Sequence, residues 1–143
     1  MRFSRIRLAL CAAMIAVAGC GDGPNAVGVS PIGDYLLTSV NGGPLPAVVI
    51  AEPGLNVQVT DGWLTLNPNN TFVESITLAT IVDNGQPELG GASCIGSYRW
   101  IGNTVTLTTP ATDICIGQLV NGTLSKNTLT IRYEGDVFVF TRQ

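Results

Sequence analysis

Alternation of polar and apolar residues, interrupted at short intervals by turn-forming residues, most constrains how this chain can fold. Thr104–Thr108 and Thr128–Tyr133 alternate strictly, and Asn56–Thr60 does the same. A period of two places successive side chains on opposite faces of a strand, so these runs predict β-strands with one buried face. From Ile32 onward, no window of helical length shows the three-four apolar spacing of a helix without a glycine, proline or asparagine cutting it. The sequence therefore predicts an all-β fold.

Turn signals separate the apolar runs. Residues 41–43 (Asn-Gly-Gly) and 83–85 (Asp-Asn-Gly) supply the residue types that accept positive φ angles in tight turns. Gly102-Asn103 predicts a two-residue hairpin. Asn121-Gly122 falls inside a strand-like run, where we expect a bulge and not a turn.

This pattern predicts about eight strands, most of them joined by short turns. The predicted strands are Asp34–Val40, Leu55–Leu66 with a kink near Gly62, Thr71–Val82, Ile95–Ile101, Thr104–Thr108, Ile116–Leu124, Thr128–Tyr133 and Val137–Arg142, with a short stretch at Val48–Ile50 that pairs as well. Successive hairpins imply an antiparallel up-and-down meander, and closing it into a barrel removes the exposed edges. A two-sheet β-sandwich is the alternative.

The N-terminus carries a targeting segment, which has to be set aside before the fold is considered. Three arginines precede the uncharged apolar run Leu8–Val17, which is too short for a permanent membrane span. The run ends in Val17-Ala18-Gly19-Cys20. This resembles the lipobox of bacterial lipoproteins. The resemblance implies cleavage before Cys20, a diacylglyceryl group on its thiol, and acylation of the new amine by a fatty acid such as palmitate. An ordinary secretory signal is the alternative.

The resemblance divides the chain into three parts. Residues 1–19 are the predicted lipoprotein signal peptide, residues 20–31 the lipidated cysteine with a Gly/Pro-bearing flexible tether, and residues 32–143 the barrel domain. The predicted location is the cell envelope. Gly21 follows the lipidated cysteine, where an aspartate is the familiar signal for inner-membrane retention, so the outer membrane is favoured over the inner membrane.

The charge of the chain limits the kinds of partner that it can bind. The full chain has 7 basic and 10 acidic residues and no histidine, and three of its arginines leave with the predicted signal peptide. An acidic mature domain without a basic stripe argues against a nucleic-acid partner. The same charge disfavours direct binding to anionic lipids, so the predicted contact with the membrane is the lipid on Cys20.

The position of each of the four cysteines in the sequence predicts its role. Cys11 lies in the signal peptide and Cys20 is the lipidation site, which leaves Cys94 and Cys115. In an oxidising compartment this pair predicts a disulfide. Closing a loop of about 20 residues would stabilise the fold by roughly 3 kcal/mol. A thiol metal or redox site is the alternative, disfavoured because there is no histidine and no close C-x-x-C spacing.

Short motifs at both ends of the domain add a second resemblance. Gly33-Asp34-Tyr35 opens the first predicted strand and Phe140-Thr141-Arg142 closes the last. This resembles lipocalin-like barrels, in which an aromatic ring from a Gly-x-Trp motif packs at the closed end beneath an arginine from the last strand. The resemblance implies that Tyr35 takes the ring position and Arg142 the cation position, as a structural pair that closes the barrel. Fold resemblance of this kind carries no ligand with it.

The sequence lacks the residue patterns of common catalytic sites. We therefore expect no enzyme, no cofactor and no metal site. The absence of histidine removes the common serine and cysteine triads. Trp63, Tyr98 and Trp100 are the candidate ligand residues at a barrel mouth. Two hypotheses follow: a lipid-anchored module that binds a small apolar ligand, or a structural or protein-interaction lipoprotein, inhibitor-like, whose barrel is filled by its own side chains.

Overall fold

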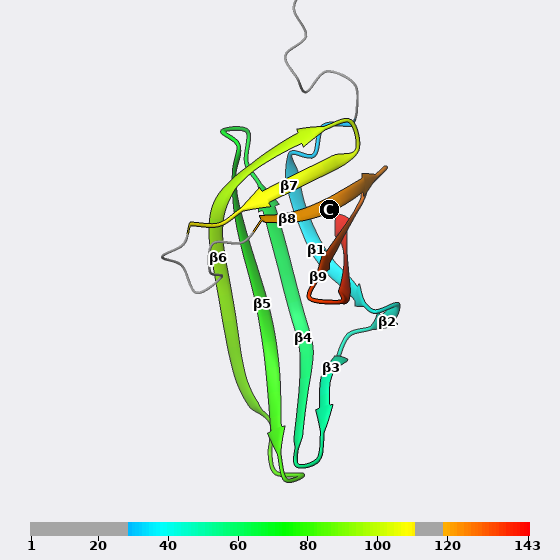
Figure 1. Ribbon diagram of the computed structural model, residues 1–143, viewed down its shortest axis with the longest axis vertical. Coiled ribbons are helices and arrows are strands. Elements are labelled where there is room, and N and C mark those ends of the chain that lie inside the picture. The colour runs from blue at the N-terminus through cyan, green and yellow to red at the C-terminus, as the bar shows by residue number, and fades with distance from the viewer. Residues whose placement is uncertain (1–28, 111–118) are drawn as a thin grey trace, which may run out of the picture.

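The structure is a computed structural model that describes residues 29–110 and 119–143 (Figure 1). These residues form strands joined by turns, and no helix occurs among them. The strands are β1 (Gly33–Val40), β2 (Gly43–Pro44), β3 (Ala47–Glu52), β4 (Leu55–Leu66), β5 (Thr71–Val82), β6 (Glu88–Ile101), β7 (Thr104–Thr108), β8 (Leu119–Ser125), β9 (Thr128–Tyr133) and β10 (Asp136–Arg142).

The strands close into an antiparallel barrel. Neighbours follow the order β1-β10-β9-β8-β7-β6-β5-β4, and β1 pairs with β4 to complete the circle. At the seam, Leu36 lies opposite Trp63, while on the other side of β1 Tyr35 lies opposite Arg142. Strands β2 and β3 are additions between β1 and β4. The predicted eight-stranded up-and-down barrel is confirmed, and the sandwich alternative is wrong. The architecture is compatible with a lipocalin-like fold.

Most strand bounds agree with the sequence pattern, and β4, β5, β7 and β9 agree residue for residue. The predicted kink in β4 appears as a register shift between Val59 and Asp61. The largest difference is β6, which begins at Glu88 and not at Ile95. Its first half contains Gly90 and Gly91, so it lacks the composition of a strand, and it is ordered by continuous pairing with β5.

The expected bulge at Asn121-Gly122 is absent from the described strands. β8 pairs with β7 in unbroken register through Gly122, and Gly122 opposite Ile131 is the last pair between β8 and β9. A Cβ on Gly122 would lie 2.9 Å from the Leu129 side chain, so this glycine serves close packing inside the barrel.

The closed end of the barrel is filled by inward side chains from the eight barrel strands. The largest fully buried ones include Tyr35, Phe72 and Phe140. Packing is tight enough that a Cβ on Gly96 would lie 2.2 Å from the carbonyl oxygen of Thr108. The core cluster comprises Tyr35, Leu37, Val40, Ala47, Val59, Leu64, Leu66, Phe72, Tyr98, Val105, Leu107, Leu124, Leu129, Ile131 and Phe140.

Three strands continue past the barrel. β1 pairs only with residues 63–66 of β4, and β7 pairs only with residues 97–101 of β6. Below these points a sheet projects beyond the shorter strands (Figure 1). It consists of β3, residues 55–61 of β4, residues 76–82 of β5 and residues 88–96 of β6. We call this part the sheet extension. The chain enters at Ser30, at the closed end, so the extension lies at the opposite end of the molecule.

Candidate functional site

Tyr35 and Arg142 lie together at the closed end, where the resemblance places a barrel-closing pair. The Arg142 Cζ is 5.1 Å from the centroid of the Tyr35 ring, within cation–π range. Nε of Arg142 donates to the Tyr35 hydroxyl at 3.2 Å, and that hydroxyl donates to the carbonyl of Pro31 at 2.6 Å. Arg142 also donates to the carbonyl of Ser30. These contacts fasten the last strand and the entering chain to the first strand, which is a structural role.

Tyr98 and Trp100 are brought together on the inner face of β6. Their ring centroids are 6.0 Å apart with planes tilted by 32°. Tyr98 is 4% exposed, and its hydroxyl donates to the carbonyl of Asn67 at 2.7 Å. Burial, with a smaller electrostatic effect of Tyr35, raises the pKa of the Tyr98 hydroxyl. These rings therefore belong to the packed interior.

The indole nitrogen of Trp100 differs from the Tyr98 hydroxyl. Nε1 is buried and has no hydrogen-bond partner among the residues that the structure describes. A buried donor without a partner costs free energy, and such groups are rare in folded proteins.

Trp63 lies elsewhere. It is 40% exposed on the outer surface of β4, beside Leu36 of β1. Leu64 and Leu66 occupy the inner face of the same strand, so the two-residue period directs Trp63 outward. The structure therefore does not bring Trp63 to the other two aromatic residues, and the alternation around Leu64 already contained that signal.

Glu74 is an inward-facing acid that the sequence analysis missed. It sits on β5 between Phe72 and Ile76 on the inner face, with Leu64 and Cys94 opposite it on the neighbouring strands. Burial raises the pKa of its carboxyl group from 4.5 to about 7. The sequence signal was available, because Glu74 occupies an apolar position of the alternating run from Phe72 to Leu78.

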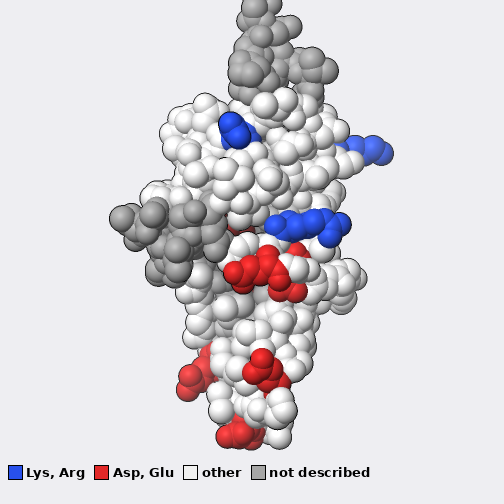
Figure 2. All heavy atoms as spheres, in the orientation of Figure 1, with Lys and Arg blue, Asp and Glu red and all other residues white. Residues whose placement is uncertain are grey.

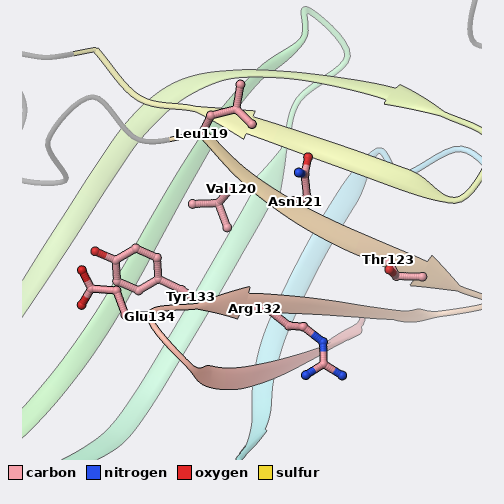
Figure 3. Close-up of a pocket in the computed structure, with 7 residues that line it drawn as sticks. All are labelled: Leu119, Val120, Asn121, Thr123, Arg132, Tyr133 and Glu134. Carbon is pink, nitrogen blue, oxygen red and sulfur yellow. The ribbon is translucent and has the colours of Figure 1, made fainter.

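A cleft opens in the barrel wall between β8 and β9. β8 remains paired with β7 as far as Leu119, but its pairing with β9 stops at Gly122 opposite Ile131. The strands diverge there and leave a space of about 540 Å³. Figure 3 shows Val120 and Tyr133 at this gap, with polar side chains around it. The lining residues are Leu119, Val120, Asn121, Thr123, Arg132, Tyr133 and Glu134.

A second, smaller hollow of about 200 Å³ lies on the β6–β7 hairpin. It is lined by Arg99, Ile101, Thr104 and Thr106. Both hollows mix apolar with polar side chains and lie at the wall of the barrel, whereas the predicted ligand position was a mouth lined by aromatic rings.

The predicted covalent sites lie mostly outside the described residues. Cys20 and Cys115 are among the residues that the structure does not describe. Cys94 is on β6, partly buried and packed against the core. In the described ranges there is no group of three His, Cys, Asp or Glu side chains arranged to hold a metal ion. Nor does any helix in those ranges reach the length and apolarity needed to cross a membrane.

The sequence matches no protein-family model, and a search of curated proteins finds no significant match.

Proposed function

We propose that this chain is a lipid-anchored protein-interaction module of the cell envelope, with a barrel that serves as a scaffold. The observation that carries the proposal is the filled interior: the positions where a lipocalin-like barrel would hold a ligand are occupied by the protein's own core side chains. A filled barrel leaves the outer surface and the sheet extension as the parts available for recognition.

The lipid anchor is part of the proposal and rests on the lipobox-like Val17-Ala18-Gly19-Cys20. The position of the chain entry supports it. Arg142 binds the carbonyl of Ser30 at the closed end, so a tether from Cys20 would hold that end toward the membrane. The sheet extension would then point away from the membrane surface, toward other envelope components.

The disulfide between Cys94 and Cys115 also belongs to this proposal. Cys94 lies on β6 next to the point where the strand leaves the barrel wall. A bond from Cys94 to the segment before β8 would strengthen the barrel there, and an extracytoplasmic location would allow it to form.

Mild detergent extraction of the protein from its own envelope, followed by native mass spectrometry, tests the function. We expect a complex with another polypeptide and no small molecule of constant mass. Recovery of a single chain that carries such a molecule would contradict the proposal. The Cys20→Ser variant tests the anchor: it should appear as a soluble, unacylated protein, and a wild-type protein that already lacks acyl mass would refute the anchor.

A second candidate function is supported by the β8–β9 cleft. Its volume of about 540 Å³ lies within the range of small-molecule sites. Val120 and Tyr133 supply apolar contact, and Arg132 supplies a cation for an acidic group. Weaker binding of an amphipathic fluorophore by Val120→Trp than by wild type would favour this candidate, provided that the matched surface control Val48→Trp binds as wild type does. Equal binding by both variants would remove it.

A further inference from the structure

The lower half of β6 has a neighbouring strand on one side only. It pairs with β5 in unbroken register from Thr80 opposite Glu88 to Thr71 opposite Ser97. β7 pairs with β6 only from Ser97 onward. Within the ranges that the structure describes, no strand lies on the other side of residues 88–93 (Figure 1). We call residues 88–93 of β6 the open edge.

The open edge presents backbone hydrogen-bonding groups. The N–H of Tyr98 donates to the carbonyl of Asn70, on the β5 side of β6. Alternate residues of a regular strand direct their N–H and C=O groups to the same side. Even-numbered residues of β6 therefore bond toward β5, and the N–H and C=O groups of Leu89, Gly91 and Ser93 point away from it. An incoming strand would find these groups already aligned.

The two free edges of the extension, as formed by the described residues, differ in the regularity of their pairing. β3 has a register shift between Val48 and Ile50. Bulges are a device by which proteins prevent strand addition. The open edge is preceded by Pro87, but it has a regular register and itself contains neither proline nor lysine. Leu89 on it is 73% exposed.

Two adjacent glycines lie in the middle of the open edge. A glycine inside a strand costs roughly 0.5–1 kcal/mol relative to alanine. A Cβ added at Gly90 would have no atom of the described residues within 4 Å, whereas one at Gly91 would lie 3.2 Å from the carbonyl oxygen of Ile76. Packing against the described residues therefore does not require glycine at position 90. Glycine in a strand is also typical of places where another backbone approaches closely.

Charge indicates what kind of segment approaches. Glu88 begins the open edge, Asp83 lies in the turn before it, and Glu52 ends β3 at the same end of the extension. The turns are adjacent, because the Asp83 N–H donates to the carbonyl of Gly54 at 2.9 Å. Figure 2 shows acidic atoms at this end of the molecule, while the basic side chains visible on that face lie over the barrel. An acidic end attracts a segment that carries lysine or arginine.

We propose that the open edge of β6 binds an extended segment of another envelope protein as an added strand, with basic side chains of that segment beside Glu88 and Asp83. This inference rests on the proposed interaction function and assigns its surface and the chemistry of its partner. The added strand bonds to Leu89, Gly91 and Ser93, and the small residues from Gly90 to Ser93 give it room.

The experiment places a photo-cross-linking amino acid at Leu89 in the full-length protein, in the cells that make it. The matched control is Ile101, an exposed apolar residue on the barrel end of the same strand. We expect Leu89 to cross-link to another protein through a peptide that contains lysine or arginine, and Ile101 not to do so. A synthetic copy of that peptide then serves as the probe for binding by wild type, Leu89→Pro and Leu89→Ser.

Leu89→Pro removes an N–H that points away from β5, so it should weaken binding of the peptide at least about tenfold. Leu89→Ser keeps the N–H and should bind within about threefold of wild type. Amide hydrogen exchange at Gly91 and Ser93 in the wild type should slow on binding. This last measurement remains decisive even if Leu89→Pro does not fold.

Several results would overturn the inference. Protein cross-links at Ile101 or elsewhere with none at Leu89 would refute the open edge and leave the proposed function standing. A cross-link between two copies of this chain would refute the basic partner. Unchanged binding by Leu89→Pro, loss of binding in Leu89→Ser, or unchanged exchange at Gly91 and Ser93 would refute strand addition. If no surface position forms a cross-link to another protein, that result would count against the proposed function itself.

Discussion

The guanidinium of Arg142 donates to the hydroxyl of Tyr35 and lies over the ring of the same residue. One side chain from the last strand thus satisfies both the polar tip and the aromatic face of a fully buried residue from the first strand. The hydroxyl in turn donates to the carbonyl of Pro31. The ends of the barrel domain are therefore joined through a single phenol group.

Removal of either partner should destabilise the fold. We expect Tyr35→Phe to lower the free energy of unfolding by about 1–2 kcal/mol, because buried hydrogen-bonding groups lose their partner. Arg142→Met keeps the aliphatic stem and should cost about 1–3 kcal/mol. The double variant should cost less than the sum by about 0.5–2 kcal/mol, as measured by urea denaturation.

Arg132→Met is the matched control, because Arg132 is exposed on β9. It should change the free energy of unfolding by less than about 0.5 kcal/mol. Strict additivity of Tyr35→Phe and Arg142→Met would show that the two side chains do not interact energetically.

The sequence was sufficient for the barrel because each half-buried strand is marked by alternation. Leu64 and Leu66 alternate with exposed or half-buried neighbours, and the structure turns them both inward. The upper half of β6 is marked by the same alternation, with Tyr98 and Trp100 two residues apart on one face. The lower half is different: Gly90 and Gly91 have little strand propensity, and their conformation comes from pairing with β5, an interaction that no local pattern contains.

The candidate sites were less accessible from sequence. Pairing Trp63 with Tyr98 and Trp100 assumed that aromatic residues gather, whereas the face of each strand decides where its side chains go. The cleft between β8 and β9 depends on where cross-strand pairing stops, which is a tertiary property. Glu74 was overlooked because an acid in an apolar run is easily assigned to solvent.

Two glycines of β6 should respond oppositely to alanine. A Cβ on Gly96 would meet the Thr108 carbonyl oxygen at 2.2 Å and the Phe72 ring at 2.6 Å. Because backbone and a buried ring cannot both move aside, we expect Gly96→Ala to cost about 3 kcal/mol or more, or to prevent folding. The Cβ of Gly90→Ala would meet no atom of the described residues within 4 Å, so this change should be neutral or stabilising by up to about 1 kcal/mol. Thermal unfolding compares the two, and a similar loss in both would contradict this packing argument.

The predicted disulfide gives a redox test. If Cys94 and Cys115 are bonded, reduction should lower the free energy of unfolding by about 2–4 kcal/mol. Cys94→Ala should show that lower stability without reductant and no further change when reductant is added. The proposed diacylglyceryl group on Cys20 would be held by a thioether, which thiols do not cleave, so the reductant would leave the proposed anchor unchanged. Equal stability of oxidised and reduced wild type would refute the bond.

Glu74 should make stability depend on pH. Its carboxyl pKa is about 7 in the fold and about 4.5 when the chain is unfolded, because burial penalises the charged form. A raised acid pKa means that the folded state holds the proton more tightly. The fold is therefore not penalised below pH 4.5, loses stability as the pH rises from about 4.5 to about 7, and carries the full penalty above that range.

Glu74→Gln removes this titration while retaining the shape of the side chain. It should raise the free energy of unfolding relative to wild type by about 2–3 kcal/mol at pH 8 and much less at pH 4.5. Urea denaturation at intervals across this range measures the difference between variant and wild type. Glu88→Gln, at an exposed acid on the sheet extension, is the matched control for the loss of one carboxylate. A Glu74→Gln difference that stays constant with pH would show that the carboxyl is solvated in the folded barrel.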